Sequence, residues 1–460
     1  MVPPWRIKEV LERAEEGPIC QEREFDLKIL VPKLNEVIKE YDIRFNPENI
    51  IESDNSLADD VYKAALDLYL EVGTYCTSSH RRILFDESEI KEAMSNHPGK
   101  FLVGAGKDAR EMSHRRVEDI NKPFCMLGPM GLPCSEELFV PICIAYIQEP
   151  IADGVTAPAL DSLDGRLIKI GTPTEVRGAV THTTLLKHAA RKVGRPGIFC
   201  TSVATAPSDA AQISASNENW GEKLTDGRFV GAIAELKVNY DLLRKMTHFV
   251  TYGCYIGALT GPLLGGYAGG PEGTAVIGVA YHFQGLMVHQ AHYQASFPLH
   301  MIHTCNTTQE LLWCTSIVSQ AIAKNTPLIT FAKGKAAAGP CTDMVLYEAA
   351  AHGLSATVSG ANLYVLGTAK EKIKDGYTPM EAKMACEVGH SIAKMRMKRS
   401  DANQIVKEIL KRYKKIEEAP VGKKFYECYD VSKVRPTKEY VELYNKVKRE
   451  LADLGIEFEY

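Results

Sequence analysis

The chain has 460 residues, a formal net charge of −4, and a composition of 45% apolar and 24% charged residues. This composition is typical of a globular protein that buries a large core. The balanced charge, with no extended basic face, gives no reason to expect nucleic acid as a partner.

The first hundred residues have the pattern of helices. Residues 56–73 read SLADDVYKAALDLYLEVG, with Ser56 as the expected cap, apolar residues at helical spacing and Gly73 at the end. Residues 86–97 predict a second, shorter helix. The start of the chain, MVPPWRIKEVLERAEEG, lacks the basic and then apolar pattern of a signal peptide. We therefore expect a helical N-terminal extension over residues 1–110.

From about residue 120 onwards, short apolar runs alternate with amphipathic helices such as residues 172–194 and 307–325. The predicted strands are KPFCMLGPMG (122–131), EPIADGVTAPA (149–159), RPGIFCTS (195–202), THFVTYGCYIGA (247–258), FPLHMIHTC (297–305) and TPLITFAKG (326–334). Repeated strand–helix units with buried strands imply a parallel sheet. Six or more such units favour an α/β fold of the (β/α)8 TIM barrel type over residues 111–400. An open, doubly wound sheet is the alternative.

The most apolar tract, residues 251–270, contains seven glycines and one proline, so it would make a poor membrane helix. The 12 cysteines are scattered and form no C-x-x-C pair. We interpret them as reduced thiols, mostly in the core. Together these features predict a cytoplasmic protein with no membrane association.

Residues 265–273, GGYAGGPEG, match neither a P-loop nor a dinucleotide-binding motif. We expect a turn in which glycines adopt positive φ angles or let the backbone approach closely. A loop over a pocket at the strand ends is the alternative.

Four histidines stand in two H-x-x-H pairs, His289/His292 and His300/His303. Zinc sites use such spacings, but two residues three apart on a strand point to opposite faces, which separates His300 from His303. We expect structural histidines and no metal. Zinc at these pairs, or in the segment YCTSSH (75–80), is the alternative.

Lys333 and Lys335 follow the apolar run PLITFA. Residues two apart at the end of a strand point to the same face, so this pair predicts a site for an anionic ligand group. A solvated loop is the alternative.

After residue 400 the sequence predicts a charged helix, a Tyr-rich segment and a last amphipathic helix. We expect this C-terminal extension, residues 401–460, to pack on the barrel or on a neighbouring subunit.

Six segments together resemble the archaeal monomethylamine methyltransferases of methanogenesis. They are LEVGTYCTSSHR, NKPFCMLGPMGLP, VGRPGIFCTS, LLGGYAGGPE, AAAGPCTDM and FYECYDVSKVRPTKEY, in the family's order from about residue 60 to the C-terminus. The resemblance implies a (β/α)8 barrel and a homo-oligomer, a hexamer. It also implies transfer of a methyl group from methylamine to the Co(I) of a corrinoid, which a separate partner protein carries, so that this chain binds no cofactor of its own.

Four positions depart from the pattern of that family. Thr201 stands at the position of pyrrolysine, the family's catalytic residue, and Leu259, beside Thr260, stands at that of an active-site glutamate. Lys333 and Lys335 match a glutamine and a tyrosine. Because threonine has no electrophilic carbon to hold a primary amine, these departures imply a substrate other than monomethylamine.

A quaternary ammonium substrate needs no covalent activation, because a neutral amine leaves when its methyl group is displaced. The protein then has to hold the methyl group in line and exclude water. We expect Thr201, at the catalytic position, to be a pocket wall or a hydrogen-bond donor. The lysine pair would bind a carboxylate or another anion, and Leu259 would no longer repel it. Phe199 and Tyr267 are the expected contacts of the methylated head.

Two other functions stay open. A homologue that has lost its special residue and its glutamate can be an inactive protein that binds or regulates. The second is a zinc-dependent methyltransferase for methoxy or thiol substrates, in which the metal activates the leaving oxygen or sulfur.

Overall fold

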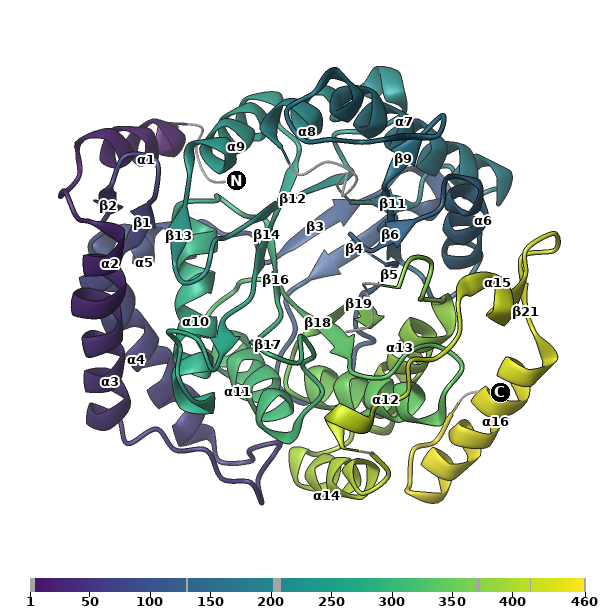
Figure 1. Cartoon of the computed structure of the whole chain (residues 1–460). Helices are drawn as coiled ribbons and strands as arrows, with labels where there is room; N and C mark the ends of the chain where they lie inside the picture. The colour runs from purple at the N-terminus through teal and green to yellow at the C-terminus, as the bar shows by residue number, and fades with distance from the viewer. Residues whose placement is uncertain (1–4, 130, 202–207, 369–372, 414, 459–460) are drawn as a thin grey trace.

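Eight parallel strands form a barrel at the centre of the computed structural model (Figure 1). The structure describes residues 5–129, 131–201, 208–368, 373–413 and 415–458. Strands that follow one another along the chain are neighbours in the barrel, and helices surround them. The predicted (β/α)8 barrel is therefore confirmed.

The strands and the helices that follow them alternate along the chain. The barrel strands are β5 (Cys125–Leu127), β7 (Gly154–Val155), β11 (Phe199–Cys200), β12 (Gly227–Gly231), β14 (Tyr255–Thr260), β16 (Tyr293–Ser296), β18 (Thr330–Ala336) and β19 (Asn362–Thr368). The helices are α6 (Glu136–Ile147), α7 (Pro173–Lys192), α8 (Asp209–Ala215), α9 (Tyr240–Tyr252), α10 (Pro271–Met287), α11 (Gln309–Asn325), α12 (Asp343–Val358) and α13 (Pro379–Met395). No helix in the described ranges is both long and apolar enough to cross a bilayer.

The barrel has a seam between β11 and β12, which are not joined by a backbone ladder in the described part of the chain. Asp226 bridges this seam, because its carboxylate accepts hydrogen bonds from Cys200 N at 3.0 Å and from Lys187 Nζ at 2.5 Å. A second buried ion pair, Glu222–Arg228 at 2.9 Å, lies beside the first. Buried charged side chains thus stand in for the missing ladder.

Aromatic side chains fill the interior of the barrel. The ring of Tyr293 packs edge to face against Phe199, Phe229 and Phe331, with centroids 6.1, 5.1 and 6.0 Å away. Gly227 makes room for this ring, since a Cβ there would lie 2.1 Å from the Tyr293 hydroxyl. The interior is therefore a packed core and not a pore.

The hairpin of β3 (Lys100–Val103) and β4 (Arg110–Ser113) closes the end of the barrel at which the strands begin, and it is visible through the ring of strands in Figure 1. The backbone amide of Ala105 donates to the carbonyl of Gly197, just before β11, at 2.8 Å. The boundary predicted at residue 110 falls inside this hairpin.

The segment before the hairpin packs on α10 and α11, mainly through its longest helix, α4. Its elements are α1 (Trp5–Glu16), α2 (Glu22–Glu24), a π-helix (Phe25–Leu30), α3 (Val31–Glu40), α4 (Asn55–Val72), β1 (Thr74–Cys76), β2 (Arg81–Ile83) and α5 (Glu87–Ser95). The predicted cap of α4 is wrong by two residues: Asp54 is the cap and accepts the N–H of Ser56. The helix ends at Gly73, as predicted, at a φ of +66°.

The C-terminal segment packs on α12 of its own chain, and side chains of α16 also form hydrogen bonds with α13. Its elements are α14 (Arg399–Leu410), a 3₁₀ helix (Ile416–Glu418), α15 (Phe425–Cys428), β20 (Tyr429–Asp430), β21 (Arg435–Pro436) and α16 (Lys438–Asp453). Tyr440 of α16 donates to Glu381 of α13 at 2.8 Å, and Tyr347 of α12 donates to Glu450 of α16.

Glu381 gives this contact a pH dependence. It is 1% exposed, and burial raises its pKa from 4.5 to about 7. The folded state therefore holds the proton more tightly, so the stabilisation of the fold by protonated Glu381 is complete below pH 4.5 and is lost as the pH rises through 7.

Between pH 6 and pH 8 we expect the free energy of unfolding of the wild type to fall by about 1 kcal/mol more than that of Glu381→Gln, measured by urea unfolding. Glu442→Gln, at an exposed position of α16, is the control, and a wild-type slope equal to that of Glu381→Gln would contradict the assignment.

The sequence patterns miss β12 and β19 and misplace β16. The predicted strand 247–258 is also wrong in its first half, because α9 runs to Tyr252 and β14 begins at Tyr255. The predicted strand 297–305 holds only the two-residue β17 (Leu299–His300), and the barrel strand lies just before it. Polar residues interrupt the apolar runs: Arg228 in β12 donates to Ser216, and Gln294 in β16 donates to the carbonyl of His282. The other short strands are β6 (Pro133–Cys134), β8 (Ala159–Leu160), β9 (Ser162–Leu163), β10 (Arg166–Leu167), β13 (Lys237–Val238) and β15 (Leu263–Leu264).

Candidate active site

Four predicted site residues lie at the carboxyl ends of barrel strands. Thr201 follows β11, Leu259 lies near the end of β14, and Lys333 and Lys335 lie in the second half of β18. A side chain at Gly334, between the two lysines, would run into α12 outside the barrel. The two lysines therefore share the inward face, as their spacing predicts, but they lie within a strand and not in a solvated loop.

Asn306 holds the backbone of both lysines. Its amide donates to the carbonyl of Lys333 at 2.7 Å and accepts from the N–H of Lys335 at 2.6 Å. Its own backbone N–H donates to the carbonyl of Lys335 at 2.9 Å. Asn306 is completely buried and thus takes the place of a neighbouring strand where β18 extends beyond the end of β16.

Glu348 of α12 fixes the segment that follows β18. Its carboxylate accepts hydrogen bonds from the backbone N–H of Ala337 at 2.7 Å and of Ala338 at 2.9 Å, and from Thr307 Oγ1 at 2.5 Å. Sequence reasoning missed both Glu348 and Asn306. The signal that could have identified Glu348 is a carboxylate within the apolar helical run MVLYEAAA.

Phe297 lies directly after β16, level with Lys333, because Ser296 pairs with Ala332 on the neighbouring strand. The ammonium of Lys333 lies 4.5 Å from the centroid of the half-buried Phe297 ring, within the range of a cation–π interaction. The ring rests on Gly261, where a Cβ would come within 3.1 Å of a ring carbon. Sequence reasoning missed Phe297, although an aromatic residue directly after a barrel strand is a recognisable signal.

Thr201 is 1% exposed and lies beside Gly227 and Tyr364 in the barrel interior. Its Oγ1 and that of Thr156, which directly follows β7, are both buried and lie close to the Tyr364 hydroxyl. Burial raises the pKa of Tyr364, while the neighbouring Thr201 and Thr156 hydroxyls lower it. Tyr364 is also level with Lys333 in the pairing of β18 with β19, so it connects Thr201 to the lysine side of the site.

The other predicted site residues differ in their placement. Leu259 is half-buried and packs against the aromatic core from β14. Phe199 exposes no surface and lies in the aromatic layer, directly before Cys200 and two positions before Thr201. Tyr267 is 44% exposed, and its ring faces the ammonium of Lys237 at 5.7 Å. The structure thus gathers Thr201, Leu259 and the lysine pair at one end of the barrel, and it does not bring Tyr267 to them.

The glycine-rich segment 265–273 is a turn that leads into α10, as predicted. Gly265 and Gly269 have φ angles of +89° and +69°, in the region that favours glycine. The N–H of Gly265 closes the turn on the carbonyl of Gly269 at 2.9 Å.

Histidines and cysteines are the side chains that would bind zinc. Over the described ranges, no group of three or more His, Cys, Asp or Glu side chains is placed to hold a metal ion. The rings of His300 and His303 lie 4.5 Å apart because residues 301–303 form a turn, so the prediction of opposite faces is wrong. Burial lowers the pKa of His289 to about 4, which keeps it neutral. All 12 cysteines are free thiols and only Cys341 is not fully buried, which confirms that they belong mostly to the core.

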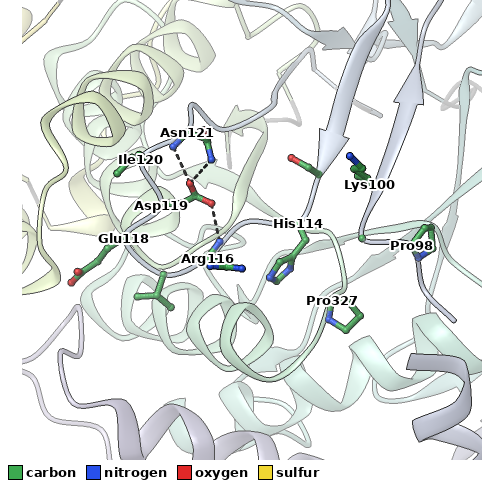
Figure 2. Close-up of a pocket in the computed structure, with 12 residues that line it drawn as sticks. Pro98, Lys100, His114, Arg116, Glu118, Asp119, Ile120, Asn121 and Pro327 are labelled. Atoms are coloured by element: carbon green, nitrogen blue, oxygen red, sulfur yellow. Dashed lines mark hydrogen bonds between the residues drawn. The ribbon is translucent and has the colours of Figure 1, made fainter. Parts of the chain in front are cut away.

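A cavity of about 660 Å³ lies at the opposite, closed end of the barrel, beside the β3–β4 hairpin (Figure 2). Figure 2 shows His114 and Arg116 side by side on the segment that leaves the hairpin, with the Asp119 carboxylate accepting the N–H of Arg116 and of Asn121. None of the predicted site residues lines this cavity. In barrels of this type, catalysis takes place at the carboxyl ends of the strands, so we assign this cavity no catalytic part.

Known proteins match the chain over nearly its whole length. The family model of monomethylamine methyltransferase MtmB matches residues 5–456. Monomethylamine methyltransferase MtmB1 of Methanosarcina barkeri is 33% identical over 449 residues, which are 97% of each chain. MtmB of Methanosarcina mazei is 32% identical over the same shares. The crystal structure of the M. barkeri enzyme superposes with a TM-score of 0.94 at 33% identity and covers 98% of both chains, as does that of a hydroxylamine complex of MtmB.

Proposed function

Since the chain belongs to the monomethylamine methyltransferase MtmB family, we propose that it transfers a methyl group from a methylated amine to the Co(I) of a corrinoid carried by a separate protein. The proposed donor is a quaternary amine, in particular one that bears a carboxylate, and not monomethylamine. The observation that carries this proposal is the inward-facing pair Lys333 and Lys335 at the carboxyl end of β18.

Methyl transfer of this kind is a displacement at the methyl carbon. The corrinoid cobalt, as second substrate, supplies the electron pair of the new bond, while the C–N bond breaks and nitrogen keeps its pair. A quaternary ammonium leaves as a neutral tertiary amine and needs no proton. Thr201 is not required to act as an acid, base or electrophile, and the site has only to orient the methyl group and exclude water.

The charges at the site support a carboxylate on the substrate. Lys333 and Lys335 offer charge-assisted hydrogen bonds to an anion. Leu259, at the position where the family has a glutamate, removes a charge that would repel that anion. Thr201 forms part of the wall, with its buried Oγ1 as a donor, and Phe199 supports this wall from within the core.

A spectroscopic assay of cobalt methylation tests the proposal. The protein is mixed with reduced corrinoid, free or protein-bound, and with mono-, di- and trimethylamine, tetramethylammonium, glycine betaine or methoxylated compounds. We expect methyl-Co(III) to form with a quaternary amine and not with monomethylamine, and methylation from monomethylamine alone would contradict the proposal. No methylation from any donor, while one of them raises the Tm, would instead indicate a binding or regulatory protein. Stoichiometric zinc together with methylation from a methoxylated compound would indicate the zinc-dependent alternative.

Replacing Lys333 with alanine is expected to raise the KM for a carboxylated quaternary amine about tenfold or more. One charge-assisted hydrogen bond, of about 1.5–3 kcal/mol, is lost. Steady-state kinetics of cobalt methylation measure the change. Lys448→Ala is a matched control, because Lys448 also covers a phenylalanine ring, that of Phe458 at 4.7 Å, but lies on α16 outside the barrel. An unchanged KM in Lys333→Ala would refute the assigned role.

A further inference from the structure

The ring of Phe297, at the carboxyl end of the barrel, already contacts an ammonium group, that of the protein's own Lys333. The Phe297 ring is half-buried and held in a row of neighbours along the strand ends, with Gly261 on one side and Lys333 on the other. Gly261 lets the ring rest on the backbone, so the ring is fixed. The Lys333 ammonium lies 4.5 Å from its centroid.

The face of an aromatic ring attracts any cation through its quadrupole. A lysine ammonium is strongly hydrated and has three donors to satisfy. A quaternary ammonium has no N–H and therefore competes well for a ring face that is shielded from water. The position of Lys333 thus marks a place where a methylated ammonium group fits by charge and by surface.

The two aromatic residues that the sequence suggested for this role do not offer such a face. Phe199 exposes no surface. Tyr267 faces Lys237, which also forms ion pairs with Glu22 and Asp26 of the N-terminal segment. Phe297 instead lies beside the lysine pair and level with Lys333.

We propose that the face of Phe297 covered by Lys333 is the binding site for the methylated ammonium group of the substrate. When the substrate binds, the ammonium of Lys333 leaves this face and pairs with the substrate's carboxylate. This inference rests on the proposed function and names its substrate contacts. The backbone of Lys333 stays fixed by Asn306, and only its flexible four-carbon stem moves. A zwitterionic donor thereby satisfies both groups at once: its cation replaces the lysine cation on the ring, and its anion pairs with the displaced lysine.

Binding of two ligands to a small set of variants tests this exchange without any methyl transfer. Tetramethylammonium carries only the cation, and glycine betaine carries the cation and the carboxylate. The variants are Phe297→Leu, which removes the ring face, Phe297→Trp, which keeps one, and Lys333→Met, which removes the charge but keeps the apolar stem. Calorimetry gives the Kd values, and circular dichroism confirms that each variant is folded.

We expect Phe297→Leu to weaken both ligands about tenfold and Phe297→Trp to bind both within about threefold of the wild type. Lys333→Met should act in opposite directions: tetramethylammonium binds about fivefold more tightly because its competitor is gone, and glycine betaine binds about tenfold more weakly because its partner is gone. Unchanged binding of both ligands to Phe297→Leu, or equal weakening of both ligands in Lys333→Met, would overturn the inference. The proposed function would still stand in that case if a quaternary amine methylates cobalt. If the wild type binds neither ligand, both the inference and the proposal of a quaternary amine as methyl donor are overturned.

Discussion

Replacing Asp226 with alanine is expected to lower the free energy of unfolding by about 3–5 kcal/mol. Lys187 and Asp226 are 3% and 1% exposed and lie 2.5 Å apart, so the substitution leaves an uncompensated charge in the interior. It also removes the acceptor of the Cys200 N–H. That hydrogen bond crosses the seam where the described parts of β11 and β12 share no ladder. Urea unfolding followed by circular dichroism measures the loss.

Two further substitutions test whether the large cost comes from the burial of this ion pair, because ion pairs at the surface contribute little. Arg177→Ala removes an ion pair with Asp164 whose side chains are 63% and 62% exposed, and it should cost less than about 1 kcal/mol. Asp226→Asn keeps an acceptor for the Cys200 N–H but removes the charge opposite Lys187, so it should lie between the two. If Asp226→Ala and Arg177→Ala unfold at the same urea concentration, the seam is not closed by Asp226.

The sequence predicted some of the barrel strands that hold an uninterrupted apolar run, although it missed β19 with its run LYVL. β18 extends the run PLITF and β5 lies within PFCML, and both are found where they were expected. β12 and β16 were harder because Arg228 and Gln294 are buried in them, with partners that other segments supply. A polar residue argues against a buried strand as long as only its neighbours along the chain are known.

The candidate site was predictable as far as it depends on spacing within one strand. Lys333 and Lys335 are two apart, and β18 puts them on one face. Phe297 and Asn306 depend instead on register between strands: Phe297 meets Lys333 because Ser296 pairs with Ala332. The predicted strand 297–305 gave the wrong register, so neither residue could be assigned. Thr201 and Leu259 were identified through family resemblance, and their roles are still predictions.

Replacing Asn306 with alanine is expected to lower kcat/KM for a carboxylated quaternary amine about 100-fold. The carbonyl of Lys333 and the N–H of Lys335 both lose their buried partner on the side where β16 has ended. Each unpaired group costs about 1–3 kcal/mol, so the end of β18 shifts to find new partners. A displacement of about 1 Å in the two ammonium groups is enough to produce a change of that size. Kinetics of cobalt methylation at saturating corrinoid measure it.

A loss of stability has to be distinguished from a loss of position, and Asn403→Ala provides the comparison. Asn403 is also buried, accepts the N–H of Ile51 at 3.0 Å and donates to the carbonyl of Glu48 at 2.9 Å, so its amide makes the same two kinds of hydrogen bond on α14. We expect similar decreases in Tm for both variants and a decrease in kcat/KM only for Asn306→Ala. Asn306→Asp keeps the acceptor for the N–H of Lys335 but loses the donor to the carbonyl of Lys333. Its kcat/KM should therefore lie between those of the wild type and Asn306→Ala. Equal activity of the two alanine variants would mean that pairing with β19 alone holds the lysines in place, and that Asn306 only fills the core.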